Sequence, residues 1–389
     1  MVCMKELNVF ISAGEASADI LGAQAIRDTR ALLPDNVRIV WRGLAGTAMR
    51  EAGALPELDS PAPSAAGLLE LLPRARELFR FRSDLYAAAF KRHYDLAALI
   101  DMPDLHLPLG RRLKAAGVPV LLYVPPQTWA WRSGRATELE SCCRRVAVLF
   151  EFEKRHLERY GLAAQYVGHP LFADWRTDGA ARRPNVETGI FRVALMPGSR
   201  RHEVEHNLPP MLEAAKILNG ADTPCFEFEL IYNTENLAAI SGMLDPLAGV
   251  ALKPRRDMQP ENYDLAFCGA GTASLELAAA GTPFMLCHRV NQISYMLARR
   301  LVKPGLAAMP NILAGYAVAP ELIQQECRAA RIADEAQRIC SDGGLERQRR
   351  AWRRLGAALK AQPRDATIAG LILDMLDIKG GDGTSSENV

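Results

Sequence analysis

Short apolar runs alternate with helical patterns in two separate parts of the chain, and this alternation constrains the fold more than any other feature. Strands that alternate with helices in this way form parallel sheets covered by helices. In the first part, the runs lie at 7–12, 38–41, 96–100, 118–124 and 146–150. In the second part, they lie at 191–196, 226–232, 264–268 and 283–287. We therefore predict two α/β domains that enclose a cleft, where such folds usually bind ligands.

A polar segment separates the two parts, and a length of 389 residues exceeds what one hydrophobic core usually organises. We predict a first domain over 1–173, a linker over 174–190 and a second domain over 191–344. Residues 345–379 have the pattern of helices broken at Pro363, in a position to pack back on the first domain. The polar tail 380–389 is expected to be disordered.

The composition is that of a globular protein without the signature of a nucleic-acid, metal or redox protein. The net charge is only +2, which does not favour nucleic acid as a partner. The eight cysteines show no C-x-x-C spacing, and no pair of the seven histidines has metal-ligand spacing. No apolar stretch is long enough to span a bilayer, and the N-terminus lacks the features of a signal peptide. We expect a cytoplasmic protein without a metal or a cofactor.

A glycine-rich turn follows the apolar run 264–268. Residues 269–272, Gly-Ala-Gly-Thr, pass directly into an alanine-rich helical pattern. Glycine lets a ligand approach the backbone, and the first N–H groups of a helix, together with its dipole, favour a phosphate. Glu276 follows Thr272 by one helical turn, where its carboxylate would accept hydrogen bonds from sugar hydroxyls. The glycines alone also fit an ordinary strand-to-helix turn.

A second glycine turn, at 198–200, follows the run 191–196. Ser199 can cap the helix that comes next, and Arg200 can offer paired donors to a diphosphate, whose charge needs neutralising when it becomes a leaving group. The alternative is a capped helix with a surface arginine. Two glycine turns in one domain, one with Arg200 and one with Glu276, favour a nucleotide diphosphate over that alternative.

Two carboxylates follow the run 96–100, at the end of a strand where α/β proteins place catalytic groups. Asp101 or Asp104 could act as a general base toward an acceptor hydroxyl. Asp104 can instead cap a helix that begins at Leu105, so Asp101 is the preferred base. The turn after the run 7–12 also opens a helix, but it has no G-x-G-x-x-G motif, and a dinucleotide is therefore not expected.

Trp129 and Trp131 follow the end of the run 118–124. Their rings could line a pocket for a sugar or an acyl chain, and packing in the core is the alternative. Both residues therefore count as candidates for the acceptor region.

The segment 65–73 is more apolar than a surface loop and runs into a basic cluster that extends from Arg74 to Arg92. The leucines that carry this apolar character are Leu68, Leu69 and Leu72. Such a pairing of apolar and basic residues could meet a membrane surface or admit acyl chains. A buried helix followed by a solvated helix face is the alternative.

Together these segments closely resemble the lipid-A-disaccharide synthase family, a glycosyltransferase family of Gram-negative bacteria. The resemblance spans most of the chain in the family's order. It rests on SAGEASAD from Ser12, GLAGTAMREAG from Gly43, GLLELLP from Gly67, IDMPDLHLPLGRRLKAAGVPVLLYV from Ile100, WAWR from Trp129, VGHPL from Val167, MPGSRRHEVE from Met196, GTASLELAAAGTP from Gly271 and ARRLVKPGLAAMPNILAG from Ala298.

This resemblance implies an α/β fold of the GT-B type, with two Rossmann-like domains facing a cleft and with C-terminal helices. It implies an inverting enzyme that joins UDP-2,3-diacylglucosamine to the 6-hydroxyl of 2,3-diacylglucosamine 1-phosphate, which gives a β-1,6-linked disaccharide 1-phosphate and UDP. It also implies a protein bound peripherally to the cytoplasmic face of the inner membrane. A homodimer is compatible with it.

The resemblance further assigns roles to single residues. Asp101 would deprotonate the acceptor 6-hydroxyl, and Arg200 would bind the diphosphate. The UDP-sugar would be held by Ser199, Gly271, Thr272, Ala273, Glu276 and Asn311, the last two at the ribose or the base. The acceptor and acyl region would include Glu15, Ser17, Asp19, Leu68, Leu69, Leu72, Trp129 and Trp131.

Two other functions stay open on the residues alone. A non-hydrolysing UDP-N-acetylglucosamine 2-epimerase would share the two-domain architecture and the UDP site, but it needs no acyl pocket. A catalytically silent lipid-binding relative would keep only the fold, and Ala18 fits that alternative. The family usually has glycine at this position, and a β-carbon would narrow the approach of a ligand if the position had a positive φ.

Overall fold

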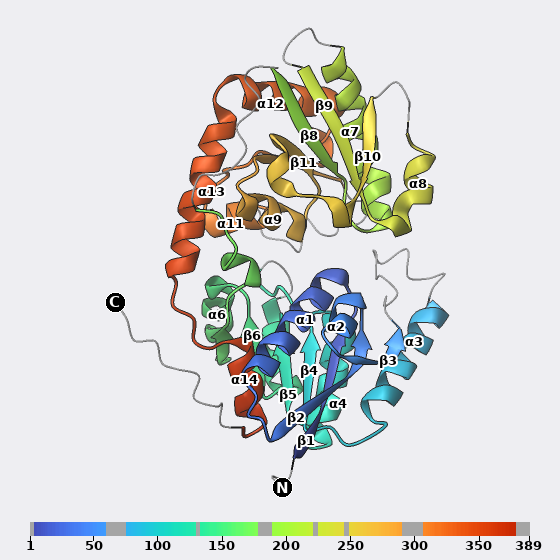
Figure 1. The fold of residues 1–389 in the computed structure, drawn as a ribbon, viewed down its shortest axis with the longest axis vertical. Helices are drawn as coiled ribbons and strands as arrows, with labels where there is room; N and C mark the ends of the chain where they lie inside the picture. Colours follow the sequence, from blue (N-terminus) through green and yellow to red (C-terminus); the bar gives the residue numbers. More distant parts are fainter. Residues whose placement is uncertain are drawn as a thin grey trace. The chain divides into compact units, whose positions relative to one another are not determined.

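The computed structural model describes residues 4–59, 75–129, 133–177, 189–220, 225–244, 249–289 and 306–378. The chain divides into two compact units, one of Met1–Pro170 with Pro363–Val389 and one of Leu171–Gln362 (Figure 1). Each unit is built on its own parallel sheet covered by helices. The prediction of two α/β domains from the alternation of apolar runs and helical patterns is confirmed.

The first unit contains a seven-stranded parallel sheet with the strand order β3-β2-β1-β4-β5-β6-β7. Its strands are β1 (Lys5–Ala13), β2 (Val37–Ala45), β3 (Leu55–Asp59), β4 (Leu96–Ile100), β5 (Val120–Tyr123), β6 (Arg145–Val148) and β7 (Ala164–Tyr166). Every residue of β4 is buried, as a strand at the centre of a sheet with helices on both faces requires.

Helices pack on both faces of this sheet. They are α1 (Ala16–Ala31), α2 (Thr47–Glu51), α3 (Ala75–Ala89), α4 (Pro103–Ala115), α5 (Leu139–Cys142), α6 (Glu151–Glu158) and α14 (Ile368–Met375). On one face, Leu99 of β4 packs in a cluster with Leu109 of α4 and Leu139 of α5. Ile100 points to the other face because side chains alternate along a strand, and Gly22 of α1 lies against it.

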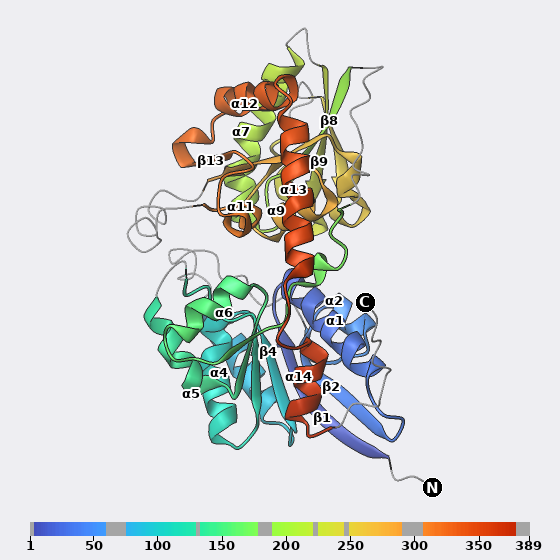
Figure 2. The ribbon, with the colours of Figure 1, turned by 90° about the vertical axis from the view of Figure 1, so that its left-hand side faces the viewer.

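The C-terminal segment belongs to the first unit although the helix before it belongs to the second. After Pro363 the chain forms α14, which packs against α1 (Figure 2). Asp365 fixes the entry to this helix, since its carboxylate accepts hydrogen bonds from the Tyr166 N–H and the Lys154 Nζ, both at 2.8 Å. The first unit is therefore completed by the end of the chain.

The second unit contains a six-stranded parallel sheet with the strand order β10-β9-β8-β11-β12-β13. Its strands are β8 (Ile190–Met196), β9 (Cys225–Tyr232), β10 (Val250–Pro254), β11 (Leu265–Cys268), β12 (Phe284–His288) and β13 (Glu321–Ile323). Its helices are α7 (Arg201–Asn219), α8 (Leu237–Ser241), α9 (Thr272–Ala280), α11 (Met309–Ala314), α12 (Ala329–Ser341) and α13 (Gly344–Ala361).

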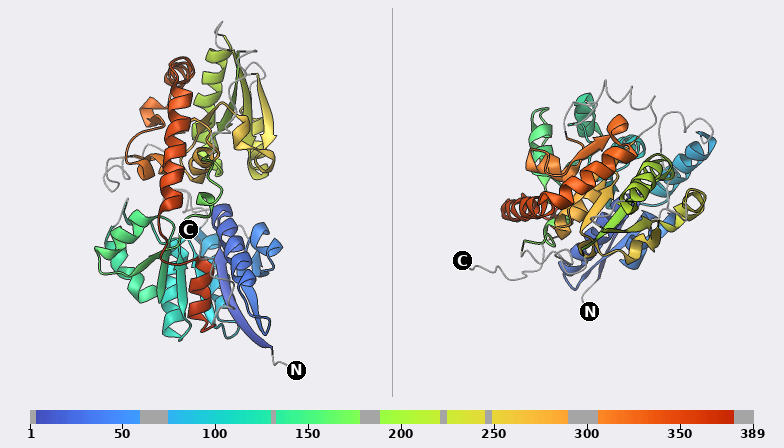
Figure 3. Two further views of the ribbon diagram at one scale, coloured as in Figure 1. Left: turned by 60° about the vertical axis from the view of Figure 1, so that its left-hand side comes forward. Right: turned by 90° about the horizontal axis from the view of Figure 1, so that it is seen from above.

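The long helix α13 runs along the second unit (Figure 3). Aromatic packing anchors it there. The Trp352 ring is fully buried and stacks on Phe284, with ring centroids 5.5 Å apart. The backbone carbonyl of Trp352 accepts a hydrogen bond from the Trp175 Nε1 at 3.0 Å. In the ranges that the structure describes, no helix has the length and the apolar character needed to cross a membrane.

The order of the strands reverses at the centre of each sheet. β1 lies between β2 and β4, and β8 lies between β9 and β11. The loops that leave the carboxyl ends of two such neighbouring strands run to opposite faces of the sheet, so a crevice opens between them, and α/β proteins bind ligands there. These two positions are the candidate ligand sites of the two units.

We expect the packing of α14 to contribute measurably to the stability of the first unit. Ile372 is 1% exposed, and its replacement in Ile372→Ala should lower the free energy of unfolding by about 2–5 kcal/mol through lost burial and a residual cavity. Ile20 on α1, which is 57% exposed, provides the control Ile20→Ala, with a change below about 0.5 kcal/mol. Denaturant unfolding measures both, and equal losses in the two variants would show that α14 does not stabilise this unit.

Candidate functional site

Asp101 lies at the point in the first sheet where the strand order reverses. It directly follows Ile100, the last residue of β4, which pairs with Ala13 at the end of β1. Its φ of 56° and that of Met102, 49°, are in the left-handed region, which residues other than glycine adopt at an energetic cost. Such conformations concentrate at functional sites, where the surrounding structure holds them. The half-buried Asp101 is thus placed at the crevice by a strained backbone.

A buried histidine holds this backbone conformation. The His106 Nδ1 lies 2.6 Å from the carbonyl oxygen of Asp101, and its Nε2 lies 2.8 Å from the Ser12 Oγ. Burial lowers the pKa of His106 to about 4, so the ring is neutral near pH 7. Because a carbonyl oxygen only accepts, Nδ1 carries the proton and Nε2 accepts from the Ser12 hydroxyl. The sequence analysis missed His106, whose only signal is its place on the buried face of α4.

Asp104 has a different environment from the one that the sequence predicts. The helix α4 begins at Pro103 with Met102 at its N-cap, and the prediction that Asp104 caps a helix starting at Leu105 is therefore wrong. Its carboxylate is 70% exposed and pairs with the Arg135 Nη2 at 2.7 Å. The preference of proline for the first turn of a helix explains the earlier start.

The first turn of α1, which follows β1, contains one residue with a clear structural role. The buried carboxylate of Asp19 accepts hydrogen bonds from the backbone N–H groups of Gly46, Ala48 and Met49, at 2.9, 2.8 and 3.2 Å. Asp19 thus caps the N-terminus of α2. This structural role accounts for a carboxylate at position 19 even if Asp19 binds no ligand.

The neighbouring candidates lie at the start of α1. Glu15 occupies the N-cap and Ser17 the first turn, and both are half-buried. Ala18 lies in the same turn within regular helix, so it does not have the positive φ that would make its β-carbon costly. The departure from glycine at Ala18 therefore places no strain on the backbone.

An aromatic cluster follows the carboxyl end of β6. The Trp129 ring packs edge-to-face on Phe152 at 5.1 Å, and Phe150 stacks between Phe152, at 5.7 Å, and His169, at 6.0 Å. Among the other residues expected in the acceptor region, Leu68, Leu69, Leu72 and Trp131 lie outside the described residues. Trp129 is half-buried at this edge of the sheet.

Glu153 is a buried carboxyl group in the helix that follows this cluster. It accepts a hydrogen bond from the Phe150 N–H at 3.2 Å, which closes the start of α6. Burial raises the pKa of Glu153 to about 7, so that the group titrates near neutral pH. The sequence analysis did not single out this residue, since a glutamate in the first turn of a helix is usually solvated.

In the second unit, the two predicted glycine turns lie side by side. Met196 of β8 pairs with Cys268 of β11, and the Gly269 N–H donates a hydrogen bond to the Met196 carbonyl at 2.8 Å. A β-carbon on Gly269 would lie 2.8 Å from the Pro197 carbonyl oxygen, so only glycine lets the turns approach this closely. Residues 196–200 and 268–272 thus lie together at the carboxyl ends of the two central strands, where this topology predicts a crevice.

The turn at Arg200 differs in one respect from the prediction. Helix α7 begins at Arg201 with Arg200 at the N-cap, so the prediction that Ser199 caps this helix is wrong. The carboxylate of Glu203 instead accepts from the N–H groups of Ser199 and Arg200, at 3.0 and 3.1 Å. The Arg200 guanidinium is 37% exposed and lies 3.9 Å from the same carboxylate. Arg200 thus lies at the carboxyl end of β8 with its guanidinium group partly exposed.

The turn before α9 presents exposed backbone. Gly271 is the N-cap of this helix with a φ of 140°, and Gly271 and Thr272 are exposed while Ala273 is half-buried. The first N–H groups of α9 have no partner within the helix and carry the positive end of its dipole. A phosphate fits this position.

Glu276 forms an ion pair with Arg255, which lies in the short helical turn η5 (Arg255–Asp257) after β10. The two side chains are 32% and 30% exposed. The ion pair with Arg255 holds the Glu276 carboxylate in place. The sequence analysis missed Arg255, because the contact joins segments that are far apart in the chain.

Asn311 is fully buried and has a structural role. Its Nδ2 donates to the Ala319 carbonyl and to the Glu321 carboxylate, both at 2.8 Å. Its Oδ1 accepts from the Val318 and Ala319 N–H groups, at 2.9 and 3.0 Å. With both ends of the amide bonded to the chain, the contact of Asn311 with the ribose or the base stays a prediction, and we do not include it in the site. No three His, Cys, Asp or Glu side chains gather as a metal site within the described part of the chain.

Comparison with known proteins identifies one family. A family model described as lipid-A-disaccharide synthetase matches residues 9–361. The lipid-A-disaccharide synthase of Trichlorobacter lovleyi is 35% identical over 391 aligned residues, which cover 95% of this chain and 97% of the relative. The lipid-A-disaccharide synthase of Koribacter versatilis is 34% identical over 348 residues, covering 87% and 89%.

Solved structures support the fold alone, because their sequence identity is low. The UDP-GlcNAc 2-epimerase of Neisseria meningitidis bound to UDP-GlcNAc aligns with a TM-score of 0.58 at 12% identity, over 96% of this chain and 99% of that chain. MurG of Acinetobacter baumannii aligns with a TM-score of 0.52 at 14% identity, over the same shares. Both comparisons cover the two units, which confirms the predicted GT-B architecture.

We expect the buried Glu153 to make stability depend on pH. The pKa of Glu153 is higher in the folded protein than in the unfolded chain, so its protonated form stabilises the fold. This stabilisation is complete below about pH 4.5 and is lost as the pH rises through about 7. The loss amounts to roughly 3 kcal/mol. Glu153→Gln keeps an acceptor for the Phe150 N–H and removes this loss. In urea unfolding, the free energy of unfolding of the variant should rise relative to that of the unaltered protein between about pH 5 and about pH 8.

The matched control is Glu151→Gln, on the same helix, where the side chain is 31% exposed and pairs with Arg155. A difference between the Glu153→Gln variant and the unaltered protein that stays constant over this pH range would contradict the assignment of a neutral carboxyl at Glu153.

Proposed function

Because this chain belongs to the lipid-A-disaccharide synthase family, we propose that its two crevices divide the family's reaction between an acceptor side and a donor side. The chain is a glycosyltransferase. The reaction proposed is transfer of 2,3-diacylglucosamine from its UDP derivative to the 6-hydroxyl of 2,3-diacylglucosamine 1-phosphate, with inversion and release of UDP. The family match over residues 9–361 carries this proposal. It also decides against the 2-epimerase alternative, whose structures are similar only in fold.

The second unit would hold the UDP-sugar at the crevice between β8 and β11. The diphosphate would accept hydrogen bonds from the first N–H groups of α9, at Thr272 and Ala273, and from the Arg200 guanidinium. These donors meet the negative charge that grows on the diphosphate as the bond to the sugar breaks. Glu203 supports this arrangement, since its contacts with the backbone of Ser199 and Arg200 fix the turn that presents the guanidinium.

Glu276 would bind the ribose hydroxyls. It lies one helical turn after Thr272 on α9, so its carboxylate is close to a diphosphate bound at the start of that helix. The ion pair with Arg255 fixes the orientation of the carboxylate, whose oxygens can accept hydrogen bonds from two hydroxyl groups. We propose Arg255 as a positioning residue for Glu276.

Asp101 would be the general base. Its carboxylate takes the proton from the acceptor 6-hydroxyl while that oxygen attacks the anomeric carbon of the donor sugar. The bond from this carbon to the diphosphate oxygen breaks on the opposite side, which inverts the configuration, and UDP leaves with the electron pair. The contact of His106 with the Asp101 carbonyl supports this role, because it fixes the residue that must reach the hydroxyl.

The substrates carry acyl chains, so the acceptor region must accommodate apolar groups. The edge-to-face pair of Trp129 and Phe152 provides an apolar surface at the carboxyl edge of the first sheet. We propose that the protein works at the cytoplasmic face of the inner membrane, bound peripherally, because lipid substrates must leave a bilayer to reach these residues.

Asp101→Asn should remove the base while keeping the size of the side chain. We expect kcat to fall by about 10²–10⁴-fold, the usual contribution of a general base, with the affinity for UDP unchanged. Asp104→Asn is the control and should keep full activity, since Asp104 pairs with Arg135. Steady-state kinetics and UDP titration measure both, and full activity of the Asp101 variant would eliminate it as the base.

His106→Leu tests whether His106 positions Asp101. Loss of the hydrogen bond to the Asp101 carbonyl should let the left-handed backbone relax and should lower kcat by about tenfold or more. UDP affinity should not change, because the UDP site lies in the other unit. His106→Asn, which keeps an N–H donor, should recover part of the activity, and equal kcat in the Leu and Asn variants would argue against positioning through this bond.

A further inference from the structure

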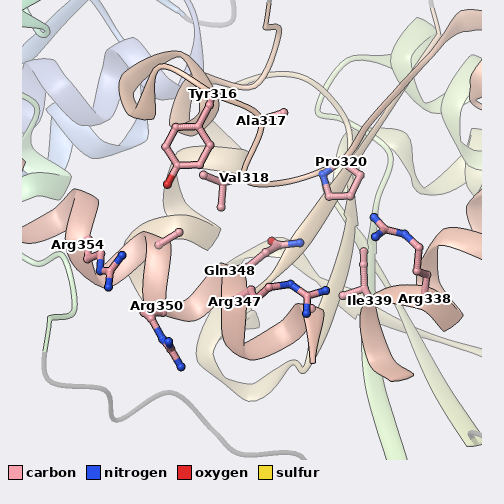
Figure 4. A pocket seen from close by; sticks show the side chains of 12 residues that line it. Tyr316, Ala317, Val318, Pro320, Arg338, Ile339, Arg347, Gln348, Arg350 and Arg354 are labelled. Carbon is pink, nitrogen blue, oxygen red and sulfur yellow. The ribbon is translucent and has the colours of Figure 1, made fainter. Parts of the chain in front are cut away.

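A pocket of about 400 Å³ in the second unit carries four arginines (Figure 4). Arg338 comes from α12, and Arg347, Arg350 and Arg354 come from α13. The opposite wall is the segment between α11 and β13, with Tyr316, Ala317, Val318 and Pro320. This pocket has no part in the reaction proposed above.

The pocket lies at the edge of the second sheet opposite to the proposed UDP site. Pro320 directly precedes β13, and Gln348 in the pocket accepts a hydrogen bond from the N–H of Phe284, the first residue of β12, at 3.0 Å. Pro320 and Gln348 therefore both lie at the amino ends of parallel strands. The turns with Arg200 and Gly271 follow the carboxyl ends of β8 and β11, so the two sites are separate.

The arginines are spaced to face one side of α13. Arg350 and Arg354 follow Arg347 by three and seven positions, which places all three on one helix face, and all are exposed. Like charges at this spacing destabilise a helix unless an anion lies between them. A bound anion would relieve the repulsion among these three charges, which line one pocket.

Protein acceptors neutralise only part of this charge. The Glu335 carboxylate pairs with Arg338, and the Arg347 Nη1 donates to the Asp342 carbonyl. Arg350 and Arg354 make no ion pair with any residue that the structure describes. By contrast, Arg353 of α13 and Arg331 of α12, which do not line the pocket, pair with Glu346 and Glu326. Among the described residues, no carboxylate therefore balances the charges of Arg350 and Arg354 in the pocket.

We propose that this pocket binds a phosphate ester. A guanidinium group offers two parallel N–H donors, which match two oxygens of a phosphate. Tyr316, 60% exposed, stands with Val318 and Pro320 on the wall that faces the arginines, and this apolar wall suits the organic part of an ester. The shared chemistry is a phosphate on an organic group, which a soluble phosphorylated molecule or a phospholipid headgroup can supply.

The test compares a pocket variant with a charge-matched control. Arg350→Gln with Arg354→Gln removes the two unpaired charges, and Arg331→Gln with Arg353→Gln removes two paired charges from the same helices. The probes are soluble pyrophosphate, titrated by calorimetry with saturating UDP present, and phosphatidylglycerol vesicles set against phosphatidylcholine vesicles in a sedimentation assay. We expect the pocket variant to weaken binding of a probe by about tenfold or more and the control to leave it unchanged.

The outcomes separate the two sources. A pocket-dependent loss of pyrophosphate binding indicates a soluble phosphorylated ligand, and a loss confined to phosphatidylglycerol vesicles indicates a lipid headgroup. Equal binding by the two double variants, or no binding of either probe, would overturn the proposal. If the proposed UDP site is wrong, the protein will not bind UDP. The comparison of the two double variants can still be interpreted in that case.

Discussion

The parallel pairing of the two central strands in each sheet is the constraint on which the rest of the structure depends. β1 pairs with β4 and β8 pairs with β11, while their other neighbours lie on opposite sides. Neighbouring loops at these carboxyl ends therefore diverge, and the residues placed there line a crevice. This accounts for the position of Asp101 in the first unit and of the Arg200 and Gly271 turns in the second without any reference to the ligand.

Polar groups from the chain itself then fix the geometry of these crevices. The Ser12–His106 pair holds the Asp101 backbone, and Glu203 holds the backbone before Arg200. The buried Asn207 ties the turn after β8 to the end of β12, since it donates to the Pro197 carbonyl and accepts from the Arg289 N–H, each at 2.7 Å. A site held in this way is ordered before its ligand arrives, which lowers the cost of binding and of reaching the transition state.

The sequence predicts the fold and the turns that carry the candidate site residues, because apolar periodicity and glycine turns are local signals. It fails where the partner is distant or the group is buried. His106 gives no local sign of its contact with Ser12, and the pair of Arg255 with Glu276 joins separate elements. The caps of α4 and α7 were misplaced for another reason, since Pro103 and Glu203 outweigh the preference for Asp or Ser at the N-cap.

The most direct test of the account is UDP release from UDP-2,3-diacylglucosamine by the purified protein, with and without 2,3-diacylglucosamine 1-phosphate. If the first unit supplies the base for an acceptor and the second holds the donor, release should require the acceptor and should yield a disaccharide 1-phosphate in equal amount. Release without the acceptor, or no release although UDP binds, would contradict the proposed division of the reaction between the two crevices.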